Sequence, residues 1–230
     1  MKKSLRPSII LLTLLIIFSC TPFFISNDFE IQTADHKVIA ILPFEMNYTG
    51  HIPKDLVKED LEKIEEAESE AFMISYYNEI LRSTKSGKKP IRVKVQNYKN
   101  TLQLLEENNI SIVGSWNIKT EKLAELLQVD AILRGYIEKN QLMPELESFG
   151  IEIGLNILNI MTNNALWPWI PFDLAKSKIV KTNYDIVNGK DGSTLWSIAY
   201  EIEADWRRPA DEIISDVNRK STRKFPYRIK

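Results

Sequence analysis

The chain has 230 residues, of which 30 are lysine or arginine and 31 are aspartate or glutamate, so its formal net charge is −1. This length is sufficient for one domain with a substantial core, and the absence of a basic excess argues against nucleic acid as a partner. A single cysteine excludes an internal disulfide and a site built from several thiolates.

The N-terminus reads as a targeting segment. Three basic residues in the first six positions precede an uncharged run over 8–18, which is shorter than a membrane-spanning helix. Cys20 follows, with Ile17 three positions before it and Ser19 directly before it. This order resembles a bacterial lipoprotein signal and implies that 1–19 is a cleaved signal peptide and that Cys20 receives lipid, palmitate included. An ordinary secretory leader with a chance cysteine is the alternative.

Lipidation would make the rest of the chain a tethered domain. A multiply acylated cysteine anchors a protein firmly, since each buried methylene contributes about 0.8 kcal/mol. Thr21 occupies the position after the cysteine at which an aspartate would retain a lipoprotein in the inner membrane. By resemblance to known sorting rules, the absence of that aspartate favours the outer membrane. We expect 20–36 to be a lipidated tether of up to about 55 Å and the domain to lie in the periplasm.

The first part of the domain alternates strands and helices. Strands are predicted over 37–44, 91–95 and 129–137, and helices over 55–84, 97–107 and 119–128, with 45–53 as a loop. The unbroken hydrophobicity of 37–44 is typical of a strand that is buried on both faces. Thr120 is placed to cap the helix 119–128. The acidic run in the first half of 55–84 is expected to be a solvated helix face.

Residues 140–176 form an apolar insertion. A helical pattern over 151–163 leaves only a narrow polar stripe, and the following segment displays Trp167, Trp169 and Phe172 around two prolines. Three interpretations stay open: packing against the domain's own sheet, contact with a partner protein, and contact with a membrane surface.

The last part of the chain predicts a hairpin and a helix. Strands over 179–187 and 194–203 alternate in hydrophobicity around a glycine-containing turn, and Pro209 opens a short C-terminal helix. The tail over 219–230 has six basic residues and no acidic one. It could contact anionic lipid or an acidic partner, although a solvated terminus explains it equally well.

No arrangement of residues predicts catalysis. The two histidines, His36 and His51, lie in the tether and the first loop, and no nucleophile elbow or metal-ligand spacing occurs. Asp130 and Asp185 could pair in space, but each is more simply a residue at a strand end or beside a turn. We therefore expect no enzyme activity, cofactor, metal site, small-molecule substrate or nucleic-acid partner.

Three short sequence blocks resemble one family. They are Val-Ile-Ala-Ile-Leu-Pro-Phe at 38–44, Val-Asp-Ala-Ile-Leu-Arg-Gly-Tyr-Ile at 129–137 directly after Leu-Ala-Glu-Leu-Leu, and Tyr-Asp-Ile-Val at 184–187 with Thr-Leu-Trp at 194–196. Together they look like bacterial lipoproteins of the CsgG and LpoB type. The resemblance implies a single α/β domain over 37–230, also similar to the N-terminal domain of TolB: a mixed β-sheet flanked by helices that ends in a β-hairpin and a short C-terminal helix.

The resemblance also implies a role. The expected function is a non-enzymatic assembly or regulatory factor that docks on a periplasmic or outer-membrane partner complex, or on further copies of itself. The alternative is a subunit of a ring-forming secretion channel of the curli-exporter type. Such a channel needs membrane-spanning hairpins with strands of about 9–11 alternating residues, and the insertion alternates only over 151–157.

Overall fold

A computed structural model describes residues 23–50, 52, 54, 56–85, 90–140, 149–151, 178–205 and 208–229. The strands are β1 (Phe23–Ile25), β2 (Val38–Ile41), β3 (Glu45–Tyr48), β4 (Lys94–Val95), β5 (Ala131–Lys139), β6 (Lys178–Asn188) and β7 (Thr194–Ala204). The helices are α2 (Phe29–Gln32), α3 (Lys58–Lys85), α4 (Tyr98–Glu107), α5 (Ile112–Trp116), α6 (Thr120–Leu127) and α8 (Ala210–Thr222).

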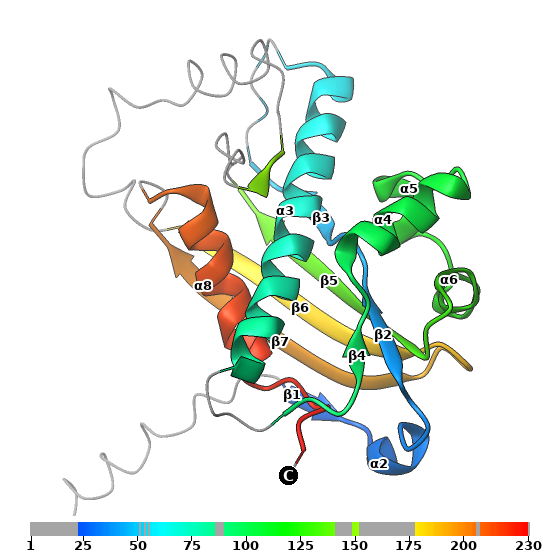
Figure 1. Ribbon diagram of the computed structural model, residues 1–230. Coiled ribbons are helices and arrows are strands. Elements are labelled where there is room, and N and C mark those ends of the chain that lie inside the picture. Colours follow the sequence, from blue (N-terminus) through cyan, green and yellow to red (C-terminus); the bar gives the residue numbers. More distant parts are fainter. Residues whose placement is uncertain are drawn as a thin grey trace, which may run out of the picture.

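The strands form one mixed sheet, in the order β1-β7-β6-β5-β2-β4, and β3 also pairs with β5 (Figure 1). β2 runs parallel to β4 and β5, whereas β5, β6, β7 and β1 pair antiparallel to one another. The predicted α/β fold is confirmed: helices flank a mixed sheet, and the chain continues through a β6–β7 hairpin into a C-terminal helix. Both hairpin strands lie within one residue of their predicted bounds.

The sheet buries both faces of its centre. On β2, Ile39 and Ile41 belong to the core beneath α3 and α8, whereas Ala40 belongs to a smaller core beneath α4 and α6. On β5, Leu133 faces the first core and Ile132 the second. Because successive side chains point to opposite faces, a strand that is covered on both sides is hydrophobic throughout.

An aromatic cluster joins the sheet to α3. The Phe44 ring lies 5.7 Å from the Tyr76 ring and 5.6 Å from the Tyr184 ring, between centroids, and Phe72 stacks on its other side at 6.2 Å. A Cβ at Gly135 would lie 2.5 Å from the Phe44 ring, so only glycine leaves room for this contact on β5. Two residues of the sequence blocks are therefore explained by packing.

The structure differs from the sequence-based expectations at three places. Residues 45–48, predicted as loop, form β3, because Pro43 interrupts the ladder but the next residues pair with β5 again. α5 has no counterpart among the predicted elements. Thr120 does not cap α6: Lys119 occupies the N-cap position, and the Thr120 hydroxyl instead accepts a hydrogen bond of 2.9 Å from Arg134 Nε.

Part of the segment 20–36, expected as a tether, packs on the domain. Residues 23–25 are a strand of the sheet, Phe29 in α2 is buried, and its ring lies 5.3 Å from that of Tyr227. The segment has no glycine and only one serine, unlike a flexible linker, and the pairing of β1 with β7 and the buried ring of Phe29 hold it on the domain.

The acidic run of α3 is not solvated throughout. The Glu68 and Lys139 side chains are both buried, and Lys139 Nζ donates a hydrogen bond of 2.6 Å to Glu68 Oε1. Burial lowers the pKa of Lys139, and the carboxylate of Glu68 opposes that shift. The pair ties the end of β5 to α3, and breaking it would leave one buried charge without this partner.

We expect Lys139→Met to lower the free energy of unfolding by about 3–5 kcal/mol, because it leaves Glu68 buried without its cation. The double change Lys139→Met with Glu68→Leu should recover most of this loss. Urea denaturation measures both. The control is Lys181→Met, which breaks the exposed pair of Lys181 with Glu138 (2.8 Å) and should cost less than about 1 kcal/mol. Equal losses in the single and double variants would contradict the assignment.

His36 forms a second contact between distant parts of the chain. Its Nδ1 lies 2.8 Å from the Tyr227 hydroxyl, and burial lowers the pKa of His36 although Asp130 acts in the opposite direction. The unfolded chain therefore takes up a proton at higher pH than the folded protein does. The free energy of unfolding should fall as pH drops below about 6.5.

We expect His36→Gln to reduce this pH dependence, since the variant has no imidazole to titrate. Thermal melts between pH 5 and pH 7.5 measure it. The midpoint of the wild-type protein should fall more than that of the variant on acidification, and parallel curves would contradict the role of His36.

Candidate functional site: the groove between strand β7 and helix α8

A groove of about 280 Å³ lies between β7, α8 and the turn that precedes α8. Its floor is apolar: Ile202 and Ala204 come from the face of β7 that points to the helix, and Ile213 and Val217 lie one turn apart on α8. All four side chains are buried. The floor therefore follows from apolar residues two positions apart on a strand and four positions apart on a helix.

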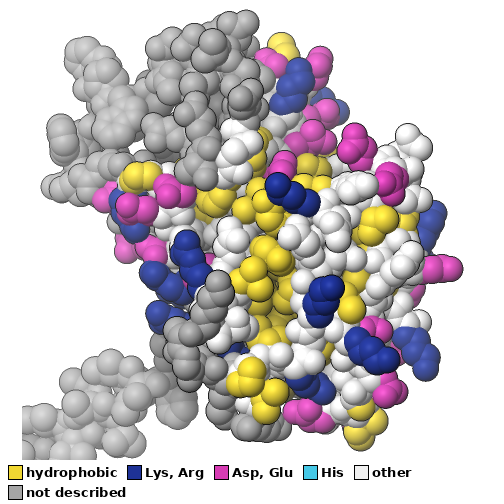
Figure 2. Space-filling model, in the orientation of Figure 1, with side chains coloured by type: hydrophobic (Ala, Val, Ile, Leu, Met, Phe, Trp, Pro, Cys, Tyr) yellow, Lys and Arg dark blue, Asp and Glu magenta, His cyan; other side chains and the backbone are white. Residues whose placement is uncertain are grey.

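Charged residues line the rim of the groove. Four are basic, namely Arg208, Arg219, Lys220 and Arg223, and two are acidic, namely Glu203 and Asp216. Figure 2 shows basic side chains gathered over α8. The rim is therefore net positive although the whole chain is near neutral. Such a rim attracts carboxylates rather than cations.

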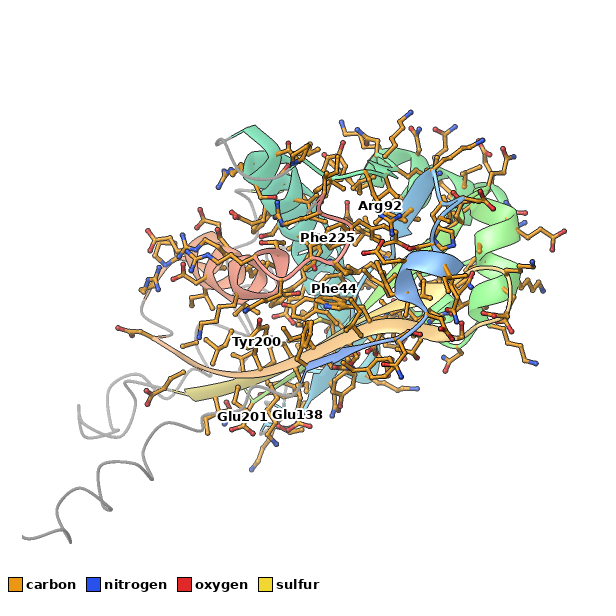
Figure 3. All side chains as sticks on the ribbon, turned by 90° about the horizontal axis from the view of Figure 1, so that it is seen from below. Phe44, Arg92, Glu138, Tyr200, Glu201 and Phe225 are labelled. Atoms are coloured by element: carbon orange, nitrogen blue, oxygen red, sulfur yellow. The ribbon has the colours of Figure 1, made fainter. Side chains whose placement is uncertain are left out.

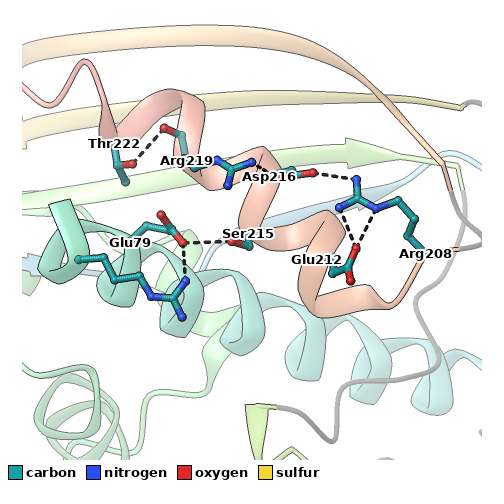
Figure 4. Close-up of polar contacts among 8 residues, drawn as sticks. Glu79, Arg208, Glu212, Ser215, Asp216, Arg219 and Thr222 are labelled. Carbon is teal, nitrogen blue, oxygen red and sulfur yellow. Dashed lines mark hydrogen bonds and ion pairs between the residues drawn. The ribbon is translucent and has the colours of Figure 1, made fainter. Parts of the chain in front are cut away.

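An ion-pair ladder along α8 holds part of this rim in place (Figure 4). Arg208 contacts Glu212 Oε2 through Nε at 3.0 Å, and Asp216 Oδ2 through another guanidinium nitrogen at 2.7 Å. Asp216 also pairs with Arg219. Exposed pairs contribute little stability singly, but this arrangement orients two guanidinium groups at the mouth of the groove.

Lys220 and Arg223 are placed differently. Both side chains are exposed, and neither forms an ion pair with the side chains that the structure describes. They lie at the C-terminal end of α8, where the helix dipole also favours positive charge. These two cations are the members of the rim that remain available to a ligand.

The wall formed by α8 is fixed to the rest of the domain. Tyr76 and Ser221 share a hydrogen bond of 3.0 Å between their hydroxyls, and Tyr184 donates one of 2.9 Å to Asn218 Oδ1. Glu79 on α3 accepts a hydrogen bond of 3.0 Å from Ser215 (Figure 4). Because the helix is held by these bonds, the groove does not require rearrangement to receive a ligand.

The dimensions of the groove favour a side chain of another protein. Small-molecule sites usually enclose about 300–1,000 Å³, and this groove is slightly smaller and open along the helix. An apolar floor with a basic rim suits one large apolar side chain that is flanked by acidic residues. The arginine and lysine side chains of the rim would bind those acidic residues.

A second hollow, of about 110 Å³, lies where α5 meets the opposite face of the sheet. Arg134 and Asp185 line it, but both are engaged. Arg134 donates hydrogen bonds to Thr120 and to the carbonyls of Trp116 and Ile118, which holds the turn between α5 and α6. Asp185 accepts a hydrogen bond of 2.7 Å from Asn183, and burial raises the pKa of its carboxyl. The arrangement is structural.

The two aspartates considered for pairing are not brought together. Asp130 lies just before β5 and accepts hydrogen bonds from the backbone N–H groups of Lys37 and Val38, at 2.7 and 2.8 Å. Asp185 lies opposite Arg134, four residues further along β5, or about 13 Å. The interpretation of Asp130 as a strand-end residue is confirmed.

Beyond the smaller core, the sheet face that α4 and α6 cover becomes polar. Glu138 and Glu201 project from it, away from α3 and α8 (Figure 3), and Lys181 lies between them in the strand register. Lys181 Nζ lies 2.8 Å from Glu138 Oε1. Lys181 thus neutralises Glu138, and the three charges of this face sum to −1, whereas the rim of the groove is net positive.

Most residues named as sites from the sequence lie outside the described residues. These are Cys20, Trp167, Trp169 and Phe172, together with most of the insertion 140–176 on which the channel alternative depends. At the start of the insertion, Phe149 and Ile151 pack against the main core. The charge of the basic tail is evident in the sequence, and the structure places the first part of the tail at the rim of the groove. No sequence pattern predicts that Ile202 forms part of the floor below this rim.

Two further findings apply to the parts of the chain that the structure describes. No helix there is long and apolar enough to cross a membrane. No cluster of three or more histidine, cysteine, aspartate or glutamate side chains there could hold a metal ion.

Several solved structures are similar to this chain. The chain is similar to the lipoprotein GNA1162 from Neisseria meningitidis, with 11% sequence identity and a TM-score of 0.41 over 82% of this chain and 96% of that chain. It is also similar to the C-terminal domain of LpoB from Salmonella enterica, with 9% sequence identity and a TM-score of 0.34 over 74% of this chain and 84% of that chain. A third similar structure is the PelC dodecamer from Paraburkholderia phytofirmans, with 10% sequence identity and a TM-score of 0.34 over 80% of this chain and 83% of that chain.

No protein-family model matches the sequence, and no curated protein does. These likenesses are of fold alone, at sequence identities of 9–11%, and they imply neither an activity nor a partner.

Proposed function

We propose that this chain is a lipid-anchored protein of the bacterial envelope, and that its domain docks an acidic segment of a partner protein in the groove between β7 and α8. The observation that carries the docking role is the combination of a buried apolar floor with a rim of four basic and two acidic residues. The role is non-enzymatic: the protein assembles or regulates a complex through contact.

The lipid anchor is supported by the N-terminal sequence. A basic start, a short apolar run and the order Ile17, Phe18, Ser19, Cys20 are those of a lipoprotein signal. In this proposal 1–19 is removed, Cys20 carries the lipid in the outer membrane, and the domain that follows lies in the periplasm. The domain begins at Phe23, since β1 is already part of the sheet.

The acidic nature of the partner follows from the rim. Lys220 and Arg223 are exposed at the end of α8, so a carboxylate can approach them without first displacing an ion pair with a described side chain. The four floor side chains are already 0–7% exposed, so they add only a small apolar contact, and the exposed cations supply the specificity and speed the association.

Cys20→Ala tests the anchor. The variant should lose palmitate labelling and either appear as a soluble periplasmic form or accumulate with its leader uncleaved. Membrane fractionation with mass spectrometry of the N-terminus measures this. Unchanged labelling, or a mature N-terminus elsewhere, would exclude lipidation at Cys20.

The double change Lys220→Glu with Arg223→Glu tests the groove. We expect a photo-crosslinking residue at position 203, on the rim, to form an adduct with the partner in intact envelopes. The double change should reduce the yield of this adduct roughly tenfold, which corresponds to about 1.4 kcal/mol of binding free energy. The adduct should also weaken as ionic strength rises, because the rim is exposed.

The matched control is Lys122→Glu with Lys190→Glu, which changes the net charge equally at two exposed positions on α6 and the β6–β7 turn. It should leave the adduct unchanged. Equal loss in both variants would show a general effect of net charge and would exclude the groove as the site. Denaturation curves of both variants establish that neither unfolds the domain.

A further inference from the structure

The N-terminal edge of the sheet exposes apolar side chains. Phe23, Phe24 and Ile25 of β1 are 52%, 48% and 41% exposed, and Ile31 of the adjoining helix α2 is 77% exposed. β1 and α2 lie at the same, lower end of the molecule in Figure 1. Hydrophobic side chains are visible along this lower edge in Figure 2.

The edge is held rigidly on the domain. β1 pairs antiparallel with β7, with Phe23 opposite Ile198 and Ile25 opposite Trp196. Beyond the strand, Ser26 N donates a hydrogen bond of 2.9 Å to the Leu195 carbonyl. Exposed apolar side chains on so firmly fixed a strand cannot fold inward, and therefore they mark a surface that meets something else.

The covalent chain limits how far this edge can lie from Cys20. Only Thr21 and Pro22 separate Cys20 from Phe23, so the two Cα atoms are at most about 11 Å apart. A lipid on Cys20 would therefore begin close to the exposed side chains of β1. A domain attached so closely cannot turn its β1 edge far from the bilayer.

Charge shows what kind of lipid surface suits this edge. Residues 23–36 contain three acidic residues, Asp28, Glu30 and Asp35, and no lysine or arginine. The segment thus lacks the basic residues that attract anionic headgroups. Contact must come from burial of apolar side chains in the interface, which favours a bilayer of neutral lipids.

We propose that the β1 edge rests on the membrane surface, with Phe23, Phe24 and Ile31 inserted into the interface of a neutral bilayer, so that the domain is held in one orientation. This proposal rests on the proposed lipidation of Cys20. Since the edge strand meets the bilayer edge-on, side chains from both faces of β1 contribute. The groove on α8 then keeps a fixed orientation relative to the membrane.

The test uses the lipidated protein in vesicles of phosphatidylcholine. Acylation blocks the only native thiol, so a cysteine introduced by Ile31→Cys can be labelled with an environment-sensitive fluorophore. The control is Lys58→Cys at the first residue of α3, which lies at the opposite end of the molecule (Figure 1). Nitroxide-bearing lipids should quench the label at 31 several-fold more than the label at 58. Equal quenching would overturn the proposal.

A second set of variants separates docking from anchoring. Phe23→Ser with Phe24→Ser should leave the protein membrane-bound through its lipid but reduce quenching at 31 to the level of the control. Ile179→Ser, at an equally exposed apolar position (54%), should not change it. If the double change leaves quenching intact, β1 is not the contact surface.

Two outcomes distinguish this proposal from the anchor itself. If mass spectrometry finds no lipid on Cys20, the anchor fails and the docking proposal falls with it. If the lipid is present and the label at 31 is shielded from iodide but not quenched from the bilayer, the edge is covered by another copy of the chain, and only the docking proposal is wrong. Anionic lipid should weaken the quenching, and an increase would contradict apolar docking.

Discussion

The close contact of the Phe44 ring with Gly135 is the constraint on which the rest of the domain depends. Phe44 follows the proline that ends the pairing of β2, and its ring lies across β5 where any side chain at 135 would collide with it. Tyr76 and Tyr184 pack edge-on against the same ring, so a helix and two strands converge on one side chain. Aromatic pairs of this kind stabilise by about 0.5–1.5 kcal/mol beyond the area that they bury.

This cluster also determines where the groove lies. Tyr76 and Tyr184 end in hydroxyls that bind Ser221 and Asn218, both on α8, and Asn218 in turn donates a hydrogen bond of 3.0 Å to the Phe72 carbonyl. The aromatic centre is thus apolar against the sheet and polar toward the helix. These hydrogen bonds fix the rotation of α8 about its own axis, so that Val217 faces the core and the basic residues of α8 lie on the rim of the groove.

Local patterns predicted much of this fold, because helix spacing, the strand alternation of 179–203 and the turn around Gly189 depend on neighbouring residues. What could not be predicted depends on distant ones. The burial of Glu68 requires Lys139 beneath α3, and the docking of 23–36 requires β7 as a partner. The candidate site is of the same kind: its charges are visible in the tail, but its apolar floor exists only once α8 packs beside Ile202.

The pairing of the first strand with the last also constrains the order of events during biogenesis. Phe23 lies opposite Ile198, 175 positions further along the chain, so β1 cannot pair with β7 until β7 has been synthesised. Closing so long a loop is costly in entropy, which places this step late in folding. If the chain is exported as proposed, the proposed cleavage site before Cys20, three residues before β1, would stay accessible to processing enzymes until the domain is nearly complete.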